Sequence, residues 1–185
     1  MPSARTSLKI GASLGALIAA VLLAGLWFAQ SGDALAKVHQ GIVHQFPEVE
    51  HISADEFARL EPEATIVFDT REPSEFAVSH IDGAIRIDPE MRPDDFLDEF
   101  GEMTLGKTVV FYCSVGARST ALANRVQDDL LLDGSEKVAN LENGLFGWHN
   151  GALPLVDDAQ KPTEAIHPFD SFWGRLIERK SLIQE

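Results

Sequence analysis

The chain carries the run VVFYCSVGARS at residues 109–119. Residues 109–112 are apolar, β-branched or aromatic, which is typical of a buried strand. A turn containing Gly116 follows, and then a run with helical periodicity from Thr120 to Leu132. The sequence therefore predicts a strand, a tight loop and a helix, with Cys113, the only cysteine in the chain, in the loop.

This arrangement favours chemistry at the cysteine. The first N–H groups of a helix have no intrahelical partner and lie at the positive end of the helix dipole, so an anion is stabilised there. A cysteine in such a position has a lowered pKa and a larger share of nucleophilic thiolate. Arg118 adds a fixed positive charge five residues after the cysteine. Two roles fit the serines: either Ser114 or Ser119 donates a hydrogen bond to the sulfur, or Ser119 caps the helix.

We therefore predict that Cys113 is the catalytic nucleophile. The candidate substrate-binding residues are those of the loop that follows it: Ser114, Val115, Gly116, Ala117, Arg118 and Ser119.

The sequence around this run alternates between strand and helix patterns. The expected strands are residues 65–68, 84–87, 107–112 and 137–141. The expected helices are residues 53–60 with a capping box, 73–78, 93–100, 120–132 and 143–149. Such alternation predicts an α/β fold with a mostly parallel sheet covered by helices on both faces. Ligands of such sheets bind beyond the carboxyl ends of the strands, where Cys113 and Asp69 are expected.

Two further segments lie on either side of the cysteine run. The first comprises IVFDTREPSEF at residues 66–76 and HIDGAIRI at 80–87, and the second is LENGLFGW at 141–148. Together with Cys-x-x-Gly-x-Arg-Ser at 113–119, they resemble the motifs of the rhodanese (sulfurtransferase) family, in the right order. Asn143 replaces the first glycine of that family's Gly-Gly-Ile-x-x-Trp pattern. The resemblance covers residues 50–156 and implies a rhodanese-like domain with an open, mostly parallel sheet flanked by helices.

The resemblance also implies a function. The Cys113 thiolate would take a sulfane sulfur from a small anionic donor such as thiosulfate, and the resulting persulfide would pass the sulfur to cyanide or to a thiol acceptor. That acceptor is either a small molecule or a protein. Backbone N–H groups of the loop would stabilise the anions, and Arg118 would orient or neutralise the donor. This chemistry requires no cofactor and no metal.

Several other motif residues are predicted to support the site. Asp69 and Arg71, with Glu72 and Glu75 following, are expected to form a structural ion-pair and hydrogen-bond network in preference to contacting substrate. His80 is expected to hold in place the turn in which it lies, and Trp148 is expected to be an aromatic residue of the core.

Two alternative functions remain open. Related phosphatases and arsenate reductases also use a loop cysteine and arginine, but they typically place one more residue between them than residues 114–117 provide. The shorter loop favours a sulfur atom over a phosphoryl group. A non-catalytic, membrane-tethered binding module of the same fold would be expected to lack the nucleophile, which is present here.

Composition excludes some partners. The net charge of −14 argues against nucleic-acid binding, because phosphate contacts need clustered lysine and arginine. A single cysteine cannot form an internal disulfide. His39 and His44 have no neighbouring cysteine or carboxylate to complete a metal site.

The N-terminal part of the chain predicts a membrane segment. Residues 10–29 are uncharged and apolar, and a helix of this length spans the hydrocarbon core of about 30 Å. Arg5 and Lys9 precede it, so residues 1–9 are expected in the cytoplasm and the catalytic domain in the periplasm, anchored by a single pass in a bacterial inner membrane. The alternative is a signal peptide cleaved after Ala36, but the apolar run exceeds the usual core of about 7–15 residues. Residues 30–49 are expected to be a juxtamembrane linker.

The tail, residues 157–185, lies outside the resemblance. Its apolar residues Phe169, Phe172, Trp173, Leu176 and Ile177 have the spacing of an amphipathic helix. Such a helix packs on the domain, lies on the membrane or binds a partner.

Overall fold

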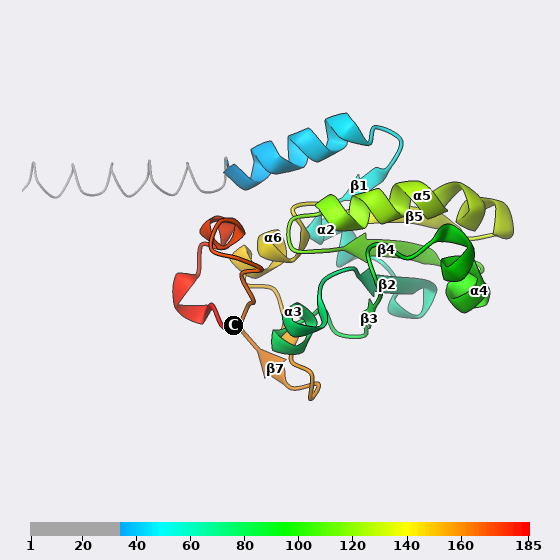
Figure 1. Cartoon of the computed structure of the whole chain (residues 1–185). Helices are drawn as coiled ribbons and strands as arrows, with labels where there is room; N and C mark the ends of the chain where they lie inside the picture. The colour runs from blue at the N-terminus through cyan, green and yellow to red at the C-terminus, as the bar shows by residue number, and fades with distance from the viewer. Residues whose placement is uncertain (1–33) are drawn as a thin grey trace, which may run out of the picture. The chain divides into compact units, whose positions relative to one another are not determined.

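The computed structural model describes residues 34–185, and a parallel β-sheet forms its centre (Figure 1). Five strands are hydrogen-bonded in the order β1-β5-β4-β2-β3, and every neighbouring pair is parallel. The strands of this sheet are β1 (Glu50–Ile52), β2 (Thr65–Asp69), β3 (Ile85–Arg86), β4 (Thr108–Tyr112) and β5 (Lys137–Leu141). The predicted α/β fold with a parallel sheet is therefore confirmed.

Helices and short turns connect the strands. The helices that follow β1 in the chain are α2 (Ala54–Phe57), α3 (Pro73–Val78), α4 (Pro93–Thr104), α5 (Ala117–Asp133) and α6 (Gly144–Asn150). Three 3₁₀ turns are present among the described residues: η1 (Pro62–Ala64), η2 (Trp173–Leu176) and η3 (Lys180–Leu182). A short antiparallel hairpin, β6 (Leu155–Val156) and β7 (Pro162–Thr163), follows α6.

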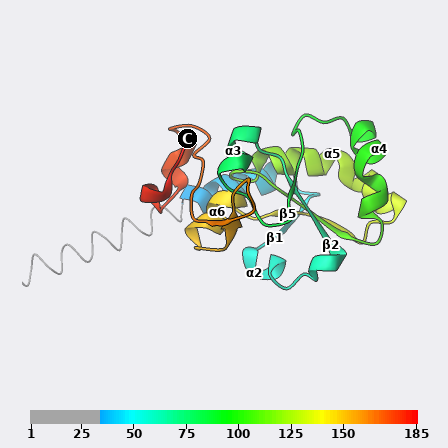
Figure 2. The same ribbon diagram turned by 90° about the horizontal axis from the view of Figure 1, so that it is seen from below.

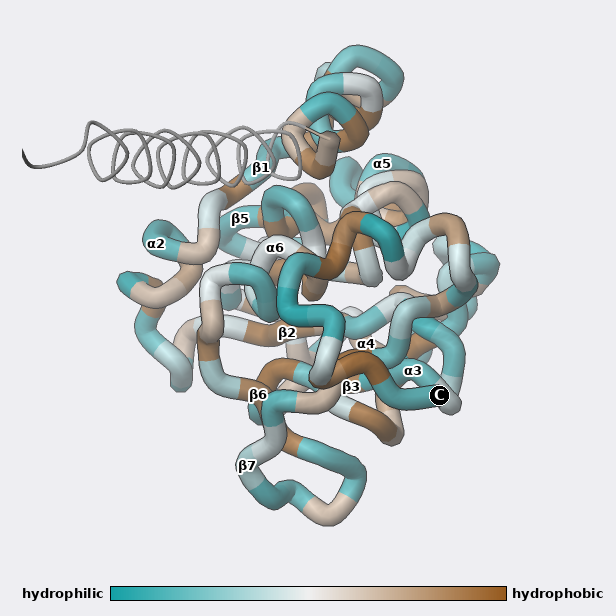
Figure 3. Tube along the Cα trace, turned by 90° about the vertical axis from the view of Figure 1, so that its left-hand side faces the viewer, coloured by the Kyte–Doolittle hydropathy of each residue, from teal (hydrophilic) through white to brown (hydrophobic). Residues whose placement is uncertain are grey.

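The central strand β4 is buried on both faces, which explains its continuous apolar sequence. Val109 and Phe111 pack in one layer with residues of α4 and α5, whereas Val110 and Tyr112 pack in the other with residues of α6. Figure 2 shows α4 and α5 on one side of the sheet and α2 on the other. In Figure 3 the hydrophobic residues lie mainly along the strands and the inner sides of the helices, while the turn beside β7 is mostly hydrophilic.

Local sequence signals account for several helix starts. The capping box of α2 is formed, because the Glu56 N–H donates to Ser53 Oγ at 3.2 Å and the Ser53 N–H donates to Glu56 Oε2 at 2.8 Å. Helix α2 nevertheless ends at Phe57, short of the predicted Leu60. Helices α3 and α4 begin with a proline, which lacks the N–H that would be unpaired there.

The helical pattern predicts an inward stripe of α5 formed by Ala121, Leu122, Val126, Leu130 and Leu131, and the structure differs from it at Ala121, which is half-buried, and at Leu131. Leu122, Val126 and Leu130 are buried as predicted, whereas Leu131 is 47% exposed. Leu131 follows Leu122 by nine residues, which is two and a half turns at 3.6 residues per turn and so points to the opposite side. Ala123 and Gln127 complete the buried face instead.

The segment predicted as a linker, residues 30–49, contains a helix. Residues 34–45 are helical, and Leu35 and Ile42, seven residues apart, are both buried. Leu35 belongs to the core cluster on the α6 side of the sheet, and Ile42 lies near Gly116 of the cysteine loop. Two buried apolar positions one heptad apart therefore dock this part of the segment on the domain, for which the sequence indicated no helix.

Within residues 34–185, no helix has both the length and the apolar character needed to cross a bilayer. The predicted anchor at residues 10–29 and the predicted cytoplasmic residues 1–9 lie outside the described residues.

The tail does not form the predicted amphipathic helix. Residues 173–176 and 180–182 form only the short turns η2 and η3. Phe169 has a positive φ of 64°, which is incompatible with a right-handed helix. Ile166 and Ile177 are fully buried, so the tail packs on the domain, next to α6 (Figure 1).

Candidate active site

The cysteine loop joins β4 to α5 at the carboxyl edge of the sheet. Cys113 follows the last residue of β4, and Gly116 is the N-cap of α5 with φ 98°, a conformation that glycine adopts without strain. The Gly116 N–H donates to Cys113 Sγ at 3.2 Å. The predicted strand, loop and helix are thus formed, and a backbone N–H group is directed at the sulfur. Helix α5 is 17 residues long, so its dipole favours negative charge at this end.

The start of α6 holds this loop in place. The Leu145 and Phe146 N–H groups donate to the carbonyl oxygens of Cys113 at 2.8 Å and Ser114 at 2.9 Å. Gly144 lies against the loop so closely that a Cβ there would stand 2.4 Å from the Cys113 oxygen. The LENGLFGW segment therefore positions the cysteine loop.

The departure from the family pattern at Asn143 has a structural explanation. Asn143 has φ 61°, in the left-handed region where glycine is usual. Asparagine is among the few other residues that visit this region routinely. The replacement of glycine by asparagine therefore preserves the backbone that leads into α6.

Glu75 on α3 forms a buried ion pair with the loop arginine. Glu75 is 1% exposed, and its two oxygens accept hydrogen bonds from Arg118 Nη1 at 2.9 Å and Nη2 at 3.0 Å. The Ser114 hydroxyl donates to Glu75 at 2.5 Å and accepts from Arg118 at 3.0 Å. The prediction treated Arg118 as a cation that orients the donor, but in the structure its charge is paired with Glu75.

The electrostatic environment keeps both members of this pair ionised. Burial acts to raise the pKa of Glu75, but the hydrogen bonds and charge of Arg118 outweigh it and leave the pKa below its usual value. Burial acts to lower the pKa of Arg118, and the hydrogen bond to Glu75, together with the charge of a Cys113 thiolate, raises it overall. Near neutral pH Arg118 is therefore a cation whose counter-charge is the ionised Glu75 carboxylate.

Neither serine hydroxyl donates a hydrogen bond to the sulfur, and Ser119 does not cap the helix. The Ser114 hydroxyl is directed at Glu75 and not at the sulfur. The Ser119 hydroxyl donates to Asn140 Oδ1 at 2.6 Å and lies 3.1 Å from the Gly116 oxygen, so it neither reaches the sulfur nor caps the helix. Ser119 instead ties α5 to β5.

A small pocket of about 130 Å³ lies over Cys113. Its walls come from the cysteine loop and from the tail: Cys113, Ser114, Val115, Ala117, Arg118, Phe169 and Trp173. Gly116 and Ser119, which were predicted to bind substrate, are not part of the lining. Cys113 itself is 1% exposed.

Phe169 and Trp173 are the pocket residues that the sequence analysis missed. They were assigned to an amphipathic helix, and no local pattern connects them to a loop more than fifty residues earlier in the chain. The Arg118 guanidinium lies 4.8 Å from the centroid of the Phe169 ring, which makes a cation–π contact across the pocket.

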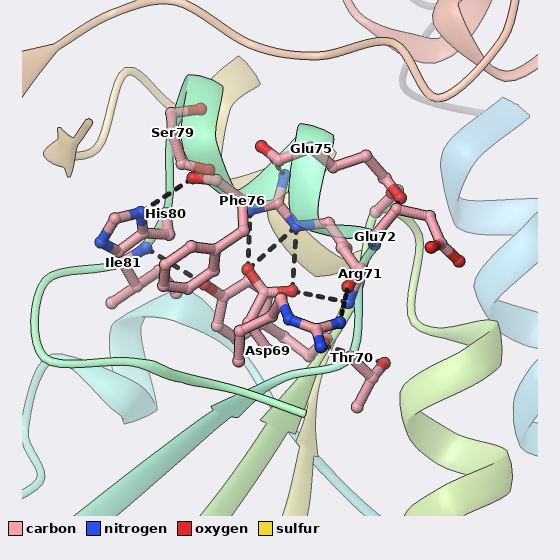
Figure 4. Close-up of polar contacts among 12 residues, drawn as sticks. Asp69, Thr70, Arg71, Glu72, Glu75, Phe76, Ser79, His80 and Ile81 are labelled. Carbon is pink, nitrogen blue, oxygen red and sulfur yellow. Dashed lines mark hydrogen bonds and ion pairs between the residues drawn. The ribbon is translucent and has the colours of Figure 1, made fainter. Parts of the chain in front are cut away.

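Asp69, the last residue of β2, and Arg71 form the predicted structural ion pair (Figure 4). Both side chains are fully buried, with Arg71 Nη2 2.7 Å from Asp69 Oδ2. The same guanidinium donates to the Ser79 oxygen at 2.6 Å and to the Glu75 oxygen at 3.3 Å, so the pair anchors α3. Burial opposes the charge of Arg71, but the charge of Asp69 raises its pKa above the usual value.

His80 and Trp148 have structural roles, as predicted. The His80 ring stacks on Phe76 with centroids 3.7 Å apart, and its Nδ1 lies 2.9 Å from the Phe76 oxygen. Trp148 is 6% exposed and donates to the Pro154 oxygen at 2.9 Å.

The variant Arg71→Met is expected to lower the free energy of unfolding by about 3–5 kcal/mol, because Asp69 would be left as an unpaired buried charge. Urea denaturation followed by circular dichroism measures the effect. Arg92→Met is the matched control, since Arg92 pairs with Asp94 on the exposed surface and its loss should change stability little. Equal effects of the two variants would contradict the role given to the buried pair.

Comparison with known proteins agrees with this geometry. The rhodanese-like domain family matches residues 53–151, which is more than half of the chain. The chain belongs to the rhodanese-like domain family. Its matched region contains the cysteine loop, the Asp69–Arg71 pair and the start of α6, but neither the helix at residues 34–45 nor the tail.

Individual relatives of the rhodanese-like domain resemble only part of the chain. An uncharacterized protein of Synechocystis is 32% identical over 120 residues, covering 62% of this chain and 60% of that protein. The tRNA uridine(34) hydroxylase of Staphylococcus carnosus is 36% identical over 98 residues, covering 51% of this chain and 30% of the hydroxylase. The matched region thus spans 60% or less of the length of these relatives.

A solved structure shows the same fold. It is a Rhodopseudomonas palustris protein of unknown function, described as a possible tyrosine phosphatase. It aligns with a TM-score of 0.52 at 22% identity and covers 63% of this chain and 92% of its own. At this identity the likeness concerns the fold alone.

Proposed function

We propose that this rhodanese-like protein is a sulfurtransferase that carries sulfur on Cys113. The observation that supports this most directly is the position of the sulfur. Cys113 Sγ lies at the N-terminus of α5, accepts the Gly116 N–H at 3.2 Å and lines a pocket of about 130 Å³. A thiolate and a persulfide are both anions that this position stabilises.

The reaction has two steps, and each breaks one sulfur–sulfur bond while one new bond forms to the transferred sulfur. The Cys113 thiolate attacks the outer sulfur of the donor, the donor's sulfur–sulfur bond breaks, and the leaving group departs with the electron pair. From thiosulfate the leaving group is sulfite. A cyanide or thiolate acceptor then attacks the terminal sulfur of the persulfide and restores the Cys113 thiolate. Donor and acceptor supply every atom and electron that is exchanged, so neither step calls for a cofactor or a metal.

The loop fits sulfur transfer better than phosphoryl transfer. Four residues, 114–117, separate Cys113 from Arg118, and Arg118 already holds a carboxylate. A phosphoryl dianion needs several convergent donors and an available cation. The net charge of −14 likewise gives no support to a tRNA substrate, because nucleic-acid binding depends on neutralising phosphates.

We also propose that residues 10–29 anchor the protein in a bacterial inner membrane, with residues 1–9 in the cytoplasm and the catalytic domain in the periplasm. Leu35 is 5% exposed and belongs to the core, so cleavage after Ala36 would remove a packed side chain. This favours the uncleaved anchor. Intact-mass analysis of the membrane fraction tests it, and a chain that begins at Lys37 would contradict it.

The activity is tested with the full-length protein in detergent. Thiosulfate or an organic thiosulfonate is supplied with cyanide, and thiocyanate is measured; aryl phosphate hydrolysis is measured in parallel. We expect thiocyanate and no phosphate release. Phosphate release without thiocyanate would favour a phosphatase, and the absence of both products would favour a binding module.

A further inference from the structure

We propose that Phe169 and Trp173 determine the donor specificity of the site, and that together with the Glu75–Arg118 pair they select an organic sulfane donor over thiosulfate. The preferred class carries its sulfane sulfur on an apolar group and bears a single negative charge, as an aryl thiosulfonate does. This inference rests on the proposed sulfurtransferase activity and names its substrate class.

The charge of the pocket disfavours a dianion. Arg118 is the only cationic residue in the pocket lining that the structure describes, and both of its Nη groups already donate to Glu75, with Nη2 also donating to Ser114. The ion pair is formally neutral. Thiosulfate would have to compete with a buried carboxylate for the guanidinium or lose its hydration without a full counter-charge. A monoanion with a dispersed charge has less hydration to lose.

The walls of the pocket favour an apolar group. Val115, Ala117, Phe169 and Trp173 supply four of its seven lining residues. Its volume of about 130 Å³ is close to that of engineered apolar cavities of about 150 Å³ that bind benzene. An aromatic ring of the donor would therefore have both the space and two aromatic partners for stacking or edge contacts.

The tail is fixed well enough to act as a wall. Ile177 is fully buried, and Asn150 of α6 donates to the Leu176 oxygen at 3.0 Å and accepts the Glu178 N–H at 2.8 Å. Phe169 sits in a positive-φ conformation that the surrounding contacts must maintain. Since Cys113 is only 1% exposed, a donor that reaches it passes these two tail side chains.

Sulfur transfer from a thiosulfonate to Cys113 conserves atoms and charge. The Cys113 thiolate forms a bond to the outer sulfur of the thiosulfonate anion, the bond between that sulfur and the sulfonyl sulfur breaks, and a sulfinate anion leaves with the electron pair. Two negative charges enter and two remain, one on the persulfide and one on the sulfinate. Cyanide then removes the sulfur as thiocyanate.

The test compares benzenethiosulfonate with thiosulfate, using the full-length protein, cyanide as acceptor and kcat/KM as the readout. We expect the wild type to use benzenethiosulfonate at least about tenfold better. Phe169→Ala and Trp173→Ala should each reduce kcat/KM for benzenethiosulfonate by about tenfold and that for thiosulfate by less than about twofold. Glu75→Gln should increase kcat/KM for thiosulfate, because it removes the counter-charge of Arg118.

Leu132→Ala is the control, because Leu132 is an apolar residue of α5, 84% exposed, that does not line the pocket. This control should leave unchanged the ratio of kcat/KM for benzenethiosulfonate to kcat/KM for thiosulfate. Phe169→Leu and Trp173→Leu retain apolar bulk and replace an alanine variant that fails to fold. They should still lower the ratio of kcat/KM for benzenethiosulfonate to kcat/KM for thiosulfate. A wild-type preference for thiosulfate, or an equal loss with both donors in folded tail variants, overturns the proposal. Absence of thiocyanate from both donors contradicts the sulfurtransferase activity itself, so the two failures are distinguishable.

Discussion

A Cys113→Ser variant is expected to lose sulfur transfer by at least about 10⁴-fold while keeping its fold, because removing a catalytic nucleophile has effects of this size. A serine oxygen is not ionised near neutral pH and forms no persulfide. The change is nearly isosteric, and the hydroxyl can still accept the Gly116 N–H that reaches the sulfur at 3.2 Å. Thiocyanate formation measures the loss, and urea denaturation measures the retained stability.

Ser135→Ala is the control for removing a buried polar group. The Ser135 hydroxyl donates to the Thr104 oxygen at 3.1 Å, away from the cysteine loop. This variant should lose some stability and retain wild-type turnover per folded molecule. Substantial turnover by the serine variant would show that Cys113 is not the sulfur carrier.

A Gly144→Ala variant is expected to lose at least about 3 kcal/mol of stability, because it combines a backbone penalty with a steric clash. The φ of 56° suits glycine, and the added Cβ would lie 2.4 Å from the Cys113 oxygen and 2.9 Å from the Gly116 nitrogen. Relief of these contacts requires movement of the cysteine loop. Activity should therefore fall even at temperatures where the variant is still folded.

Gly101→Ala serves as the matched control for this substitution. Gly101 lies in α4, and a Cβ there would meet nothing within 4 Å. Alanine should stabilise this helix by about 0.5–1 kcal/mol, because glycine is unfavourable in a helix interior. The two variants are thus predicted to change the urea midpoint in opposite directions. Destabilisation by Gly101→Ala together with tolerance at Gly144 would contradict the described packing.

Elements with a local cause were predictable from the sequence. Helix α3 and strand β5 have the predicted bounds, because a proline start and a short run bounded by turn residues on both sides are both local patterns. The capping box at Ser53 acts over three residues. The placement of Cys113 was also predictable, because a buried strand followed by a glycine turn and a helix leaves little freedom at the junction.

Features that depend on distant parts of the chain were not predictable. The partner of Arg118 is Glu75, 43 residues away, and nothing local distinguishes this carboxylate from Glu72. The tail has helical spacing, yet Phe169 adopts a positive φ and Gly174 packs against Pro168, where a Cβ would come within 2.8 Å. Tertiary packing therefore overrides the local pattern there and brings two aromatic residues to the site.

The central claim is that Cys113 carries sulfur, and intact-mass spectrometry tests it most directly. The full-length protein is incubated with thiosulfate or benzenethiosulfonate, desalted and weighed before and after cyanide. The account predicts a gain of one sulfur atom that cyanide removes and that the Cys113→Ser variant does not show. No gain with either donor, or a gain that persists in the serine variant, would contradict it.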